Sequence, residues 1–155
     1  MPARILTKEQ IQNLSKESFN CSQIVAMQWA EEFGYEKAEA ARMAAAFGGG
    51  LSIGEVCGAV TGAMLVLGWK YGNGEAGELQ KKEQLKRKSA EFREQFTAKH
   101  KTLICRELTG YDFAKPGQHD AARDAGVLAS LCPVLVQDAL VILEEVTRED
   151  EVFPE

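Results

Sequence analysis

The chain has 155 residues, of which 45% are hydrophobic and 26% are charged, a composition typical of a globular protein and unlike that of a disordered or fibrous one. Its length predicts a single domain, residues 1–155. The 18 basic and 23 acidic residues give a net charge of -5 without a block of basic residues, so nucleic acid is not an expected partner. Residues 1–18 lack the apolar core of a secretory signal, and the longest apolar run, residues 56–69, is shorter than the ~20 residues that span a bilayer. We therefore expect a cytoplasmic protein without direct membrane insertion.

Helical spacing of apolar residues recurs along the chain and no long alternation indicates a strand. The pattern predicts an all-α, single-domain bundle of about six to seven helices. The first helix should cover residues 7–18, where Thr7 and Gln10 have the spacing of a capping box. The second should cover residues 20–33, and the alanine-rich third residues 36–47.

The fourth predicted helix, residues 52–69, is the glycine-rich centre of the bundle, and Ser52 with Glu55 predicts its start. Glycines recur every four residues here, which puts them on one face of a helix. They are Gly50, Gly54, Gly58 and Gly62. A neighbouring backbone could approach this face closely, beside Cys57, although ordinary tight helix packing produces the same pattern.

The remaining helices are expected at residues 78–98, 103–108, 120–131 and 133–146. Pro133 suits the first position of the last helix, where its missing N–H is no loss. His100 and His119 lie in polar, loop-like stretches, so we expect both at the surface. Trp69, near the end of the fourth helix, is a candidate contact of a homodimer.

The four cysteines are Cys21, Cys57, Cys105 and Cys132. No two lie within a helical turn of each other and no CxxC is present, so the sequence carries neither a thioredoxin-type motif nor paired metal ligands. In a reducing compartment such thiols are catalytic, redox-sensing or metal-binding, or they are small buried hydrophobic residues.

The predicted helices assign different reactivities to the cysteines. Cys21 and Cys132 should lie at helix N-termini, where free N–H groups and the helix dipole favour a thiolate. Cys57 should lie a turn inside its helix, where the charge of Glu55 opposes ionisation. Arg106 could favour the thiolate of Cys105 if its side chain folds back.

Residues 57–62 read CGAVTG, preceded by FGGGLSIGEV, and the other cysteines stand in the segments FNCSQ, CRELTGYD and CPVLVQDALVILEE. With these features the chain resembles the C_GCAxxG_C_C family of redox-active proteins, which is defined by four cysteines and a CGAxxG motif. The resemblance implies a small helical, cytoplasmic protein with a redox role, and members are reported near transporter genes. It assigns the family's four cysteines to those of this chain, and the motif glycines to Gly58 and Gly62.

Three functions remain open at this point. The first is a thiol-dependent oxidoreductase that needs no cofactor, in which Cys132 or Cys21 attacks the disulfide of a redox partner or substrate and Cys57 or Cys105 resolves the intermediate. The second is a binding module in which all four cysteines hold a metal ion or an iron–sulfur cluster. The third is a helical interaction protein associated with a transport system. Four cysteines allow three pairings, and the sequence does not choose among them.

Overall fold

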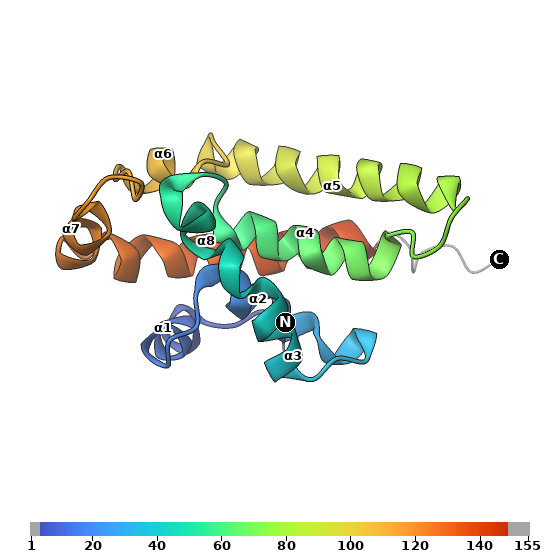
Figure 1. The fold of residues 1–155 in the computed structure, drawn as a ribbon, viewed down its shortest axis with the longest axis horizontal. Helices are drawn as coiled ribbons and strands as arrows, with labels where there is room; N and C mark the ends of the chain where they lie inside the picture. Colours follow the sequence, from blue (N-terminus) through green and yellow to red (C-terminus); the bar gives the residue numbers. More distant parts are fainter. Residues whose placement is uncertain (1–3, 149–155) are drawn as a thin grey trace.

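The computed structural model describes residues 4–148, and residues 1–3 and 149–155 lie outside the described part. Within residues 4–148 the fold is all-α, as the sequence predicts, and β-type pairing is limited to one isolated antiparallel bridge between Val56 and Ile104 (Figure 1). The α-helices are α1 (Lys8–Lys16), α2 (Cys21–Trp29), α3 (Lys37–Ala44), α4 (Gly58–Tyr71), α5 (Leu79–His100), α6 (Cys105–Thr109), α7 (Gln118–Asp124) and α8 (Val127–Arg148), with short helical turns η1 (Glu31–Phe33), η2 (Ala45–Phe47) and η3 (Gly50–Gly54).

The first helices begin where the sequence indicates. Thr7 caps α1: its hydroxyl accepts from the backbone N–H of Gln10 at 3.1 Å, and the Gln10 side chain accepts from the Thr7 N–H at 2.8 Å. Asn20 and Gln23 form a second capping box at the start of α2, with distances of 3.0 and 2.9 Å. This box places Cys21 at the first position of α2.

The glycine-rich helix α4 is central, as predicted, because it contacts α2, α5 and α8 (Figure 1). Most of the largest fully buried side chains of the core come from these four helices and include Trp29, Val60, Leu67, Phe92, Phe96 and Leu140. Burial of one such side chain stabilises the fold by about 1.5–3 kcal/mol. The cysteine-bearing segments are therefore attached to a firmly packed core.

The start of α4 differs from the prediction. Ser52 caps no helix: Gly49, Gly50, Leu51 and Ser52 all have positive φ, between 61° and 63°. The helix begins six residues after Ser52, at Gly58, and Cys57 is its N-cap residue. The predicted capping box was wrong because adjacent glycines allow a left-handed turn, which draws Leu51 and Ser52 into a conformation that L-residues seldom adopt.

The C-terminal helices also differ from the prediction. The expected helix at residues 120–131 is divided, since α7 ends at Asp124 and α8 runs without interruption from Val127. Pro133 therefore lies inside α8, not at its first position. A proline there leaves the carbonyl four residues earlier without its helical partner. That carbonyl, of Ala129, accepts from the Gln12 side chain of α1 at 3.0 Å, so a tertiary hydrogen bond replaces the helical one.

Helix α8 packs along the core and contacts most of the other helices, namely α1, α2, α4, α5, α6 and α7. Its mean hydropathy of 1.9 over an 18-residue window and its length would also suit a membrane span. In the fold, however, its apolar residues Leu135, Leu140 and Leu143 are buried against the neighbouring helices. Packing thus accounts for part of the apolar composition of α8, since 44% of the same window is buried.

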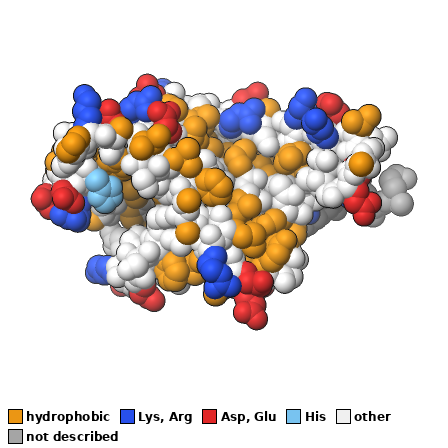
Figure 2. All heavy atoms as spheres, viewed as in Figure 1, with side chains coloured by type: hydrophobic (Ala, Val, Ile, Leu, Met, Phe, Trp, Pro, Cys, Tyr) orange, Lys and Arg blue, Asp and Glu red, His pale blue; other side chains and the backbone are white. Residues whose placement is uncertain are grey.

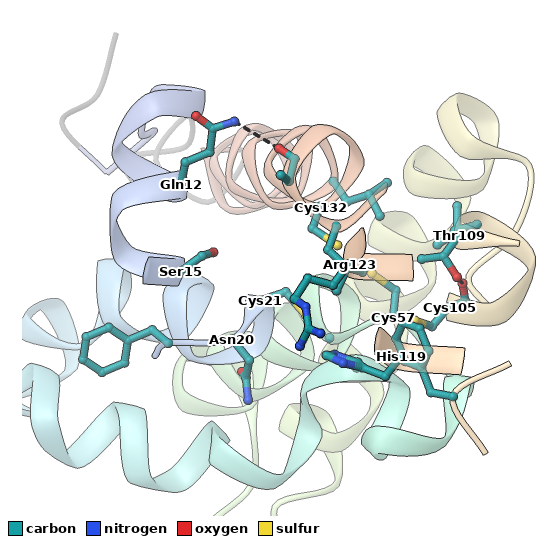
Figure 3. A pocket seen from close by; sticks show the side chains of 18 of the residues that line it. Gln12, Ser15, Asn20, Cys21, Cys57, Cys105, Thr109, His119, Arg123 and Cys132 are labelled. Carbon is teal, nitrogen blue, oxygen red and sulfur yellow. Dashed lines mark hydrogen bonds between the residues drawn. The ribbon is translucent and has the colours of Figure 1, made fainter. Parts of the chain in front are cut away.

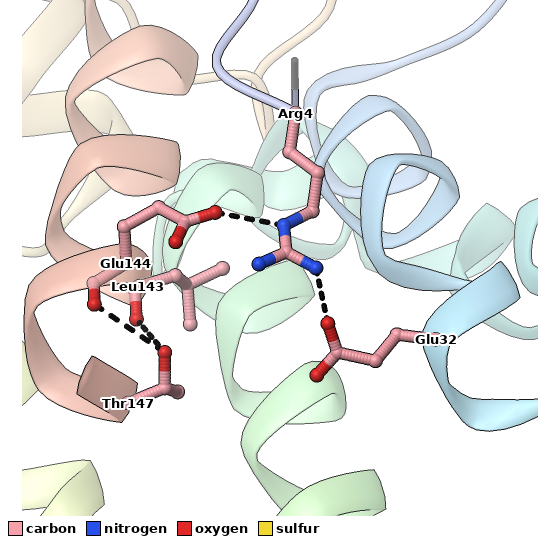
Figure 4. Close-up of polar contacts among 5 residues, drawn as sticks. All are labelled: Arg4, Glu32, Leu143, Glu144 and Thr147. Atoms are coloured by element: carbon pink, nitrogen blue, oxygen red, sulfur yellow. Dashed lines mark hydrogen bonds and ion pairs between the residues drawn. The ribbon is translucent and has the colours of Figure 1, made fainter. Parts of the chain in front are cut away.

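Arg4 ties the N-terminal segment to the bundle (Figure 4). Its Nε donates to the Glu144 carboxylate at 2.7 Å, and another guanidinium nitrogen donates to Glu32. The guanidinium also lies 3.7 Å above the centre of the Trp29 ring. Arg4 thus joins η1, α2 and α8.

Not all of the predicted surface residues are exposed. His100 was expected at the surface, but its side chain is only 14% exposed and its Nε2 lies 2.8 Å from Asp138 Oδ2. The prediction was wrong because His100 is still part of α5, whose C-terminal end packs against α8. Trp69 is partly buried and its ring contacts those of Phe33 and Tyr35, at centroid distances of 5.9 and 4.9 Å.

Charged side chains of both signs alternate around the edge of the molecule, whereas apolar side chains gather across the middle of the face shown in Figure 2. Within the described part of the chain, the exposed large apolar residues are Met43, Phe47, Leu51, Ile53 and Leu79. Four of these five belong to α3 or to the two short turns that connect it to α4.

Candidate functional site: a cavity lined by four cysteines

All four cysteines line one cavity of about 700 Å³. Figure 3 shows them around a common space, each carried by a different part of the fold. They lie 27 to 111 residues apart in the chain, so the fold alone brings them together. No disulfide joins them in this structure. Of the site residues predicted from the sequence, the four cysteines and Gly58 thus line one cavity, whereas Gly54 and Gly62 do not line it.

Cys57 and Cys105 are positioned by the isolated antiparallel bridge. The N–H of Cys57 donates to the carbonyl of Leu103 at 2.7 Å, and the N–H of Cys105 donates to the carbonyl of Glu55 at 2.6 Å. Cys57 follows Val56 and Cys105 follows Ile104, so the two cysteines are diagonal neighbours across the bridge. Because side chains alternate along extended backbone, both cysteine side chains lie on the opposite side from those of Val56 and Ile104. Diagonal neighbours in such a pair lie about 7–8 Å apart or less. Both thiols are buried, with 4% and 7% exposure.

Cys21 lies against the start of α4. Its sulfur is in contact with Gly58, where a Cβ atom would overlap the Cys21 Sγ. The backbone N–H groups of Cys21 itself, Ser22, Gly49 and Gly58 lower the pKa of this thiol against the effect of burial. N–H groups near a sulfur favour a negative charge on it. Gly58 therefore serves the site by lacking a side chain, which lets the sulfur approach the start of α4.

Cys132 enters the cavity from the side of α8. It was predicted at a helix N-terminus, but it lies in the sixth position of α8, one residue before Pro133. The N-terminal stabilisation predicted for its thiolate is therefore absent. Three other cysteines lie at helix starts: Cys21 in α2, Cys105 in α6, and Cys57 as the N-cap of α4.

Every thiol in the cavity is held in the neutral form. Burial, followed in importance by the charge of Cys21, raises the pKa of Cys105 to about 11 and that of Cys132 to about 12. Burial also raises the pKa of Cys57 well above its usual value, with the charge of Cys21 next in importance. For Cys21, burial raises the pKa as well, but its backbone N–H donors oppose the shift. Cys21 and Cys132 were predicted to be the more ionised thiols of any pair. For Cys132 this prediction was wrong, because burial raises its pKa to about 12 and no helix terminus offsets the effect. For Cys21 the backbone N–H groups oppose the effect of burial, although they do not reverse it.

The expected effects of Glu55 and Arg106 on the thiols are not found. Arg106 does not fold back onto Cys105: its guanidinium donates to Glu55 Oε1 at 2.7 Å and to the carbonyl of Gly54 at 3.2 Å. The two charges compensate each other outside the cavity. Burial, not Glu55, is the main cause of the raised pKa of Cys57.

The glycines serve the site in two ways. Gly58 and Gly62 lie on the face of α4 that meets α2, and a Cβ at Gly62 would lie 2.7 Å from the backbone oxygen of Ser22. The predicted close approach of a neighbouring backbone is confirmed for these two. Gly50 and Gly54 do not share that face, because they precede the helix. They have positive φ, and a Cβ at Gly50 would lie 2.9 Å from the Cβ of Cys105.

Several residues of the cavity were not identified from the sequence. Phe113 and His119 stack edge to face, with ring centroids 4.9 Å apart, and both line the cavity together with Arg123 of α7 and Lys16 of α1. Figure 3 shows His119 and Arg123 beside the cysteines. Only the fold brings α7 to this place. His119 is exposed, as predicted, but it lies at the site.

A metal centre finds no geometric support. Among residues 4–148, no three side chains of His, Cys, Asp or Glu are close enough together to hold a metal ion. The cysteine sulfurs share the cavity without converging on one point. The iron–sulfur alternative thus stays a prediction, and metal analysis of the purified protein tests it.

Residues 19–146 match the sequence profile of the family described as "Putative redox-active protein (C_GCAxxG_C_C)". This match covers most of the chain and includes all four cysteines and the CGAVTG motif. The chain belongs to the C_GCAxxG_C_C family. Comparisons with curated proteins and with solved structures gave no significant match. The C_GCAxxG_C_C family description indicates redox activity and names no substrate.

Proposed function

We propose that the protein is a thiol–disulfide oxidoreductase in which Cys21 attacks a disulfide and Cys57 resolves the mixed disulfide. The observation that carries the proposal is the placement of both sulfurs at the start of α4, in a cavity that all four cysteines line. The family description, which indicates redox activity, agrees with this chemistry.

Cys21 is the best candidate for the attacking thiol. Backbone N–H groups surround its sulfur and oppose the effect of burial, whereas the pKa of Cys105 and of Cys132 is raised by burial to about 11 and about 12. Thiolate, not thiol, is the nucleophile, so the cysteine with the most N–H donors gains most. The same donors stabilise Cys21 as leaving group when the enzyme is reduced again.

Cys57 is the best candidate for the resolving thiol. Of the other cysteines, Cys21 has the largest electrostatic effect on Cys57, which indicates that these sulfurs are neighbours. Gly58, which touches the Cys21 sulfur, directly follows Cys57 in the chain. Cys105 and Cys132 remain as a second pair, which could pass electrons to or from the first by the same exchange.

The reaction conserves electrons. The Cys21 thiolate forms a bond to one sulfur of the substrate disulfide, and the other leaves as a thiolate that takes up a proton. Cys57 then loses its proton and attacks Cys21, which releases the second substrate thiol. The substrate gains two electrons and the protein retains one disulfide, which an external dithiol donor must reduce.

Thiol counting tests this proposal. Anaerobically purified protein is alkylated and weighed intact, before and after treatment with one equivalent of diamide, and metal content is measured on the same sample. We expect four free thiols before treatment, two afterwards, recovery of four with dithiothreitol, and no stoichiometric metal. Four unresponsive thiols would refute the exchange chemistry. Stoichiometric metal that protects the thiols would replace it with the metal-binding alternative.

A further inference from the structure

We infer that the cavity binds a small disulfide that carries carboxylate groups, and this inference rests on the proposed thiol–disulfide exchange. The feature that leads to it is the charge of the lining. Among residues 4–148, the basic residues Lys16 and Arg123 line the cavity, whereas no Asp or Glu does. The cavity lining thus carries basic side chains, although the net charge of the protein is -5.

The size of the substrate follows from the burial of the sulfurs. Cys57 and Cys105 are only 4% and 7% exposed, and Cys21 is partly covered. Exchange requires the attacking sulfur to lie in line with the disulfide under attack. The flat surface of a folded protein cannot bring its disulfide to such sulfurs, whereas a small molecule can enter a cavity of about 700 Å³.

The walls would hold the two parts of such a molecule separately. Apolar residues lie around the cysteines and suit the carbon chain and the disulfide itself. They are Phe19, Leu108, Phe113, Leu128 and Leu135. Lys16 and Arg123 suit the carboxylates, since their charged groups are on exposed helices, α1 and α7.

The two cationic side chains, Lys16 and Arg123, differ in their ion pairing with neighbouring carboxylates. Lys16 forms no ion pair with the described residues, so its charge faces the solvent at the cavity. Arg123 lies 3.1 Å from Asp120 and 3.4 Å from Asp124, but both carboxylates are more than half exposed. Exposed pairs of this kind are worth little, and a ligand carboxylate can compete for the guanidinium.

The net charge of the protein makes it possible to distinguish the effect of the local cations from that of the overall charge. A protein of charge -5 repels an anionic substrate at long range and attracts a cationic one. A preference for the anionic substrate must therefore come from local cations. The reaction itself is the exchange already described: each molecule of disulfide gives two molecules of a carboxylate-bearing thiol, and the protein is left with one disulfide.

Three disulfides of similar size provide the test: 3,3′-dithiodipropionate, which is anionic, bis(2-hydroxyethyl) disulfide, which is neutral, and cystamine, which is cationic. The second-order rate of thiol loss from reduced protein is measured for each and divided by the rate of 2-mercaptoethanol with the same disulfide. We expect the corrected rate for the anionic disulfide to exceed that for cystamine about tenfold at low salt, and the difference to shrink as salt is added.

Variants locate the cause of the preference. Lys16→Gln and Arg123→Gln should each lower the anionic-to-cationic rate ratio about threefold. The matched control is Lys82→Gln, which removes an exposed lysine near the start of α5, outside the cavity. It should leave the ratio unchanged.

The outcomes separate the two proposals. Equal corrected rates for the three disulfides, or a preference for cystamine, would overturn the inference and leave the exchange chemistry intact. Failure of all three disulfides to oxidise the protein thiols would overturn the proposed function itself. An anionic preference that Lys82→Gln weakens as much as Lys16→Gln would show that overall charge, not the cavity, is responsible, and would also overturn the inference.

Discussion

Gly58 and the sulfur of Cys21 are in direct contact, and no side chain larger than hydrogen fits between them. The contact joins the first turn of α2 to the first turn of α4, and the backbone N–H of Gly58 lowers the pKa of the same thiol. The CGAxxG motif thus has a structural meaning: its first glycine, Gly58, makes room for a cysteine that lies 37 residues earlier in the chain.

Replacement of the motif glycines should therefore destabilise the protein. Gly58→Ala and Gly62→Ala each place a methyl group against α2, at a cost of about 1–3 kcal/mol of unfolding free energy. Gly68→Ala in the same helix is the matched control, since a Cβ there meets nothing within 4 Å. It should stabilise by about 0.5–1 kcal/mol. Urea unfolding measures all three, and equal effects at positions 58 and 68 would contradict the close contact.

The hydrogen bond from Gln12 to Ala129 should depend on Pro133. Gln12→Ala should cost about 1 kcal/mol in the natural chain, because the carbonyl loses its partner. In a Pro133→Ala background the new N–H at residue 133 bonds that carbonyl, so the same substitution should cost little. A double-mutant cycle on unfolding free energies checks this coupling. Strict additivity would mean that Gln12 does not compensate for the proline.

The left-handed turn before α4 should be strained at Leu51. Its φ of 61° costs a non-glycine residue about 1–2 kcal/mol, and its side chain is 46% exposed, so little burial offsets the cost. Leu51→Gly should raise the unfolding free energy by roughly 1 kcal/mol. Ala38→Gly, at an exposed position of α3, is the control and should lower it by about 0.5–1 kcal/mol. A loss of stability from both would argue against the strained turn.

Stability of the reduced protein should fall at alkaline pH. Free cysteine ionises near pH 8.5, whereas burial raises the pKa of Cys132 to about 12 in the folded state. The unfolded chain therefore releases its protons first, and the unfolding free energy declines from about pH 8.5 upward. Each such thiol contributes up to about 1.4 kcal/mol per pH unit.

Urea titrations between pH 7.5 and 10, with a phosphine reductant under argon, measure this decline. Cys132→Ser removes one of the titrating thiols and should make the slope shallower by up to about 1.4 kcal/mol per unit above pH 8.5. An unchanged slope would mean that Cys132 is not held neutral by the fold.

The all-α class and the early helices were predictable because local signals determine them. The capping boxes at Thr7 and, in the structure, at Asn20 use residues only three apart, and the helical spacing of apolar residues on one face locates α5. The four cysteines could be proposed as one site because the CGAVTG motif marks the chain as resembling a family defined by them.

The positions of the thiols within their helices were less accessible to sequence analysis. Ser52 and Glu55 carry a valid capping pattern, but tertiary contacts around Gly50 and Gly54 favour a left-handed turn and move the helix start to Gly58. Pro133 signals a helix start, but Gln12, 121 residues away, removes the penalty of a proline inside α8.

The thiol pKa values and the cavity lining needed the fold itself. A helix terminus favours the thiolate of Cys21 locally, yet burial by distant segments decides the direction of the shift. His119 and Arg123 have no sequence pattern that links them to the cysteines. They reach the site only because α7 folds over the end of the cavity formed by α2, α4 and α8.

The most direct test of the account is to trap the mixed disulfide on Cys21. Reduced Cys57→Ser protein is treated with bis(2-hydroxyethyl) disulfide, quenched with acid, and mapped by peptide mass spectrometry. The account predicts an adduct on Cys21 that persists in this variant, whereas the natural chain proceeds to a disulfide between Cys21 and Cys57. A persistent adduct on Cys105 or Cys132, with Cys21 unmodified, would contradict it.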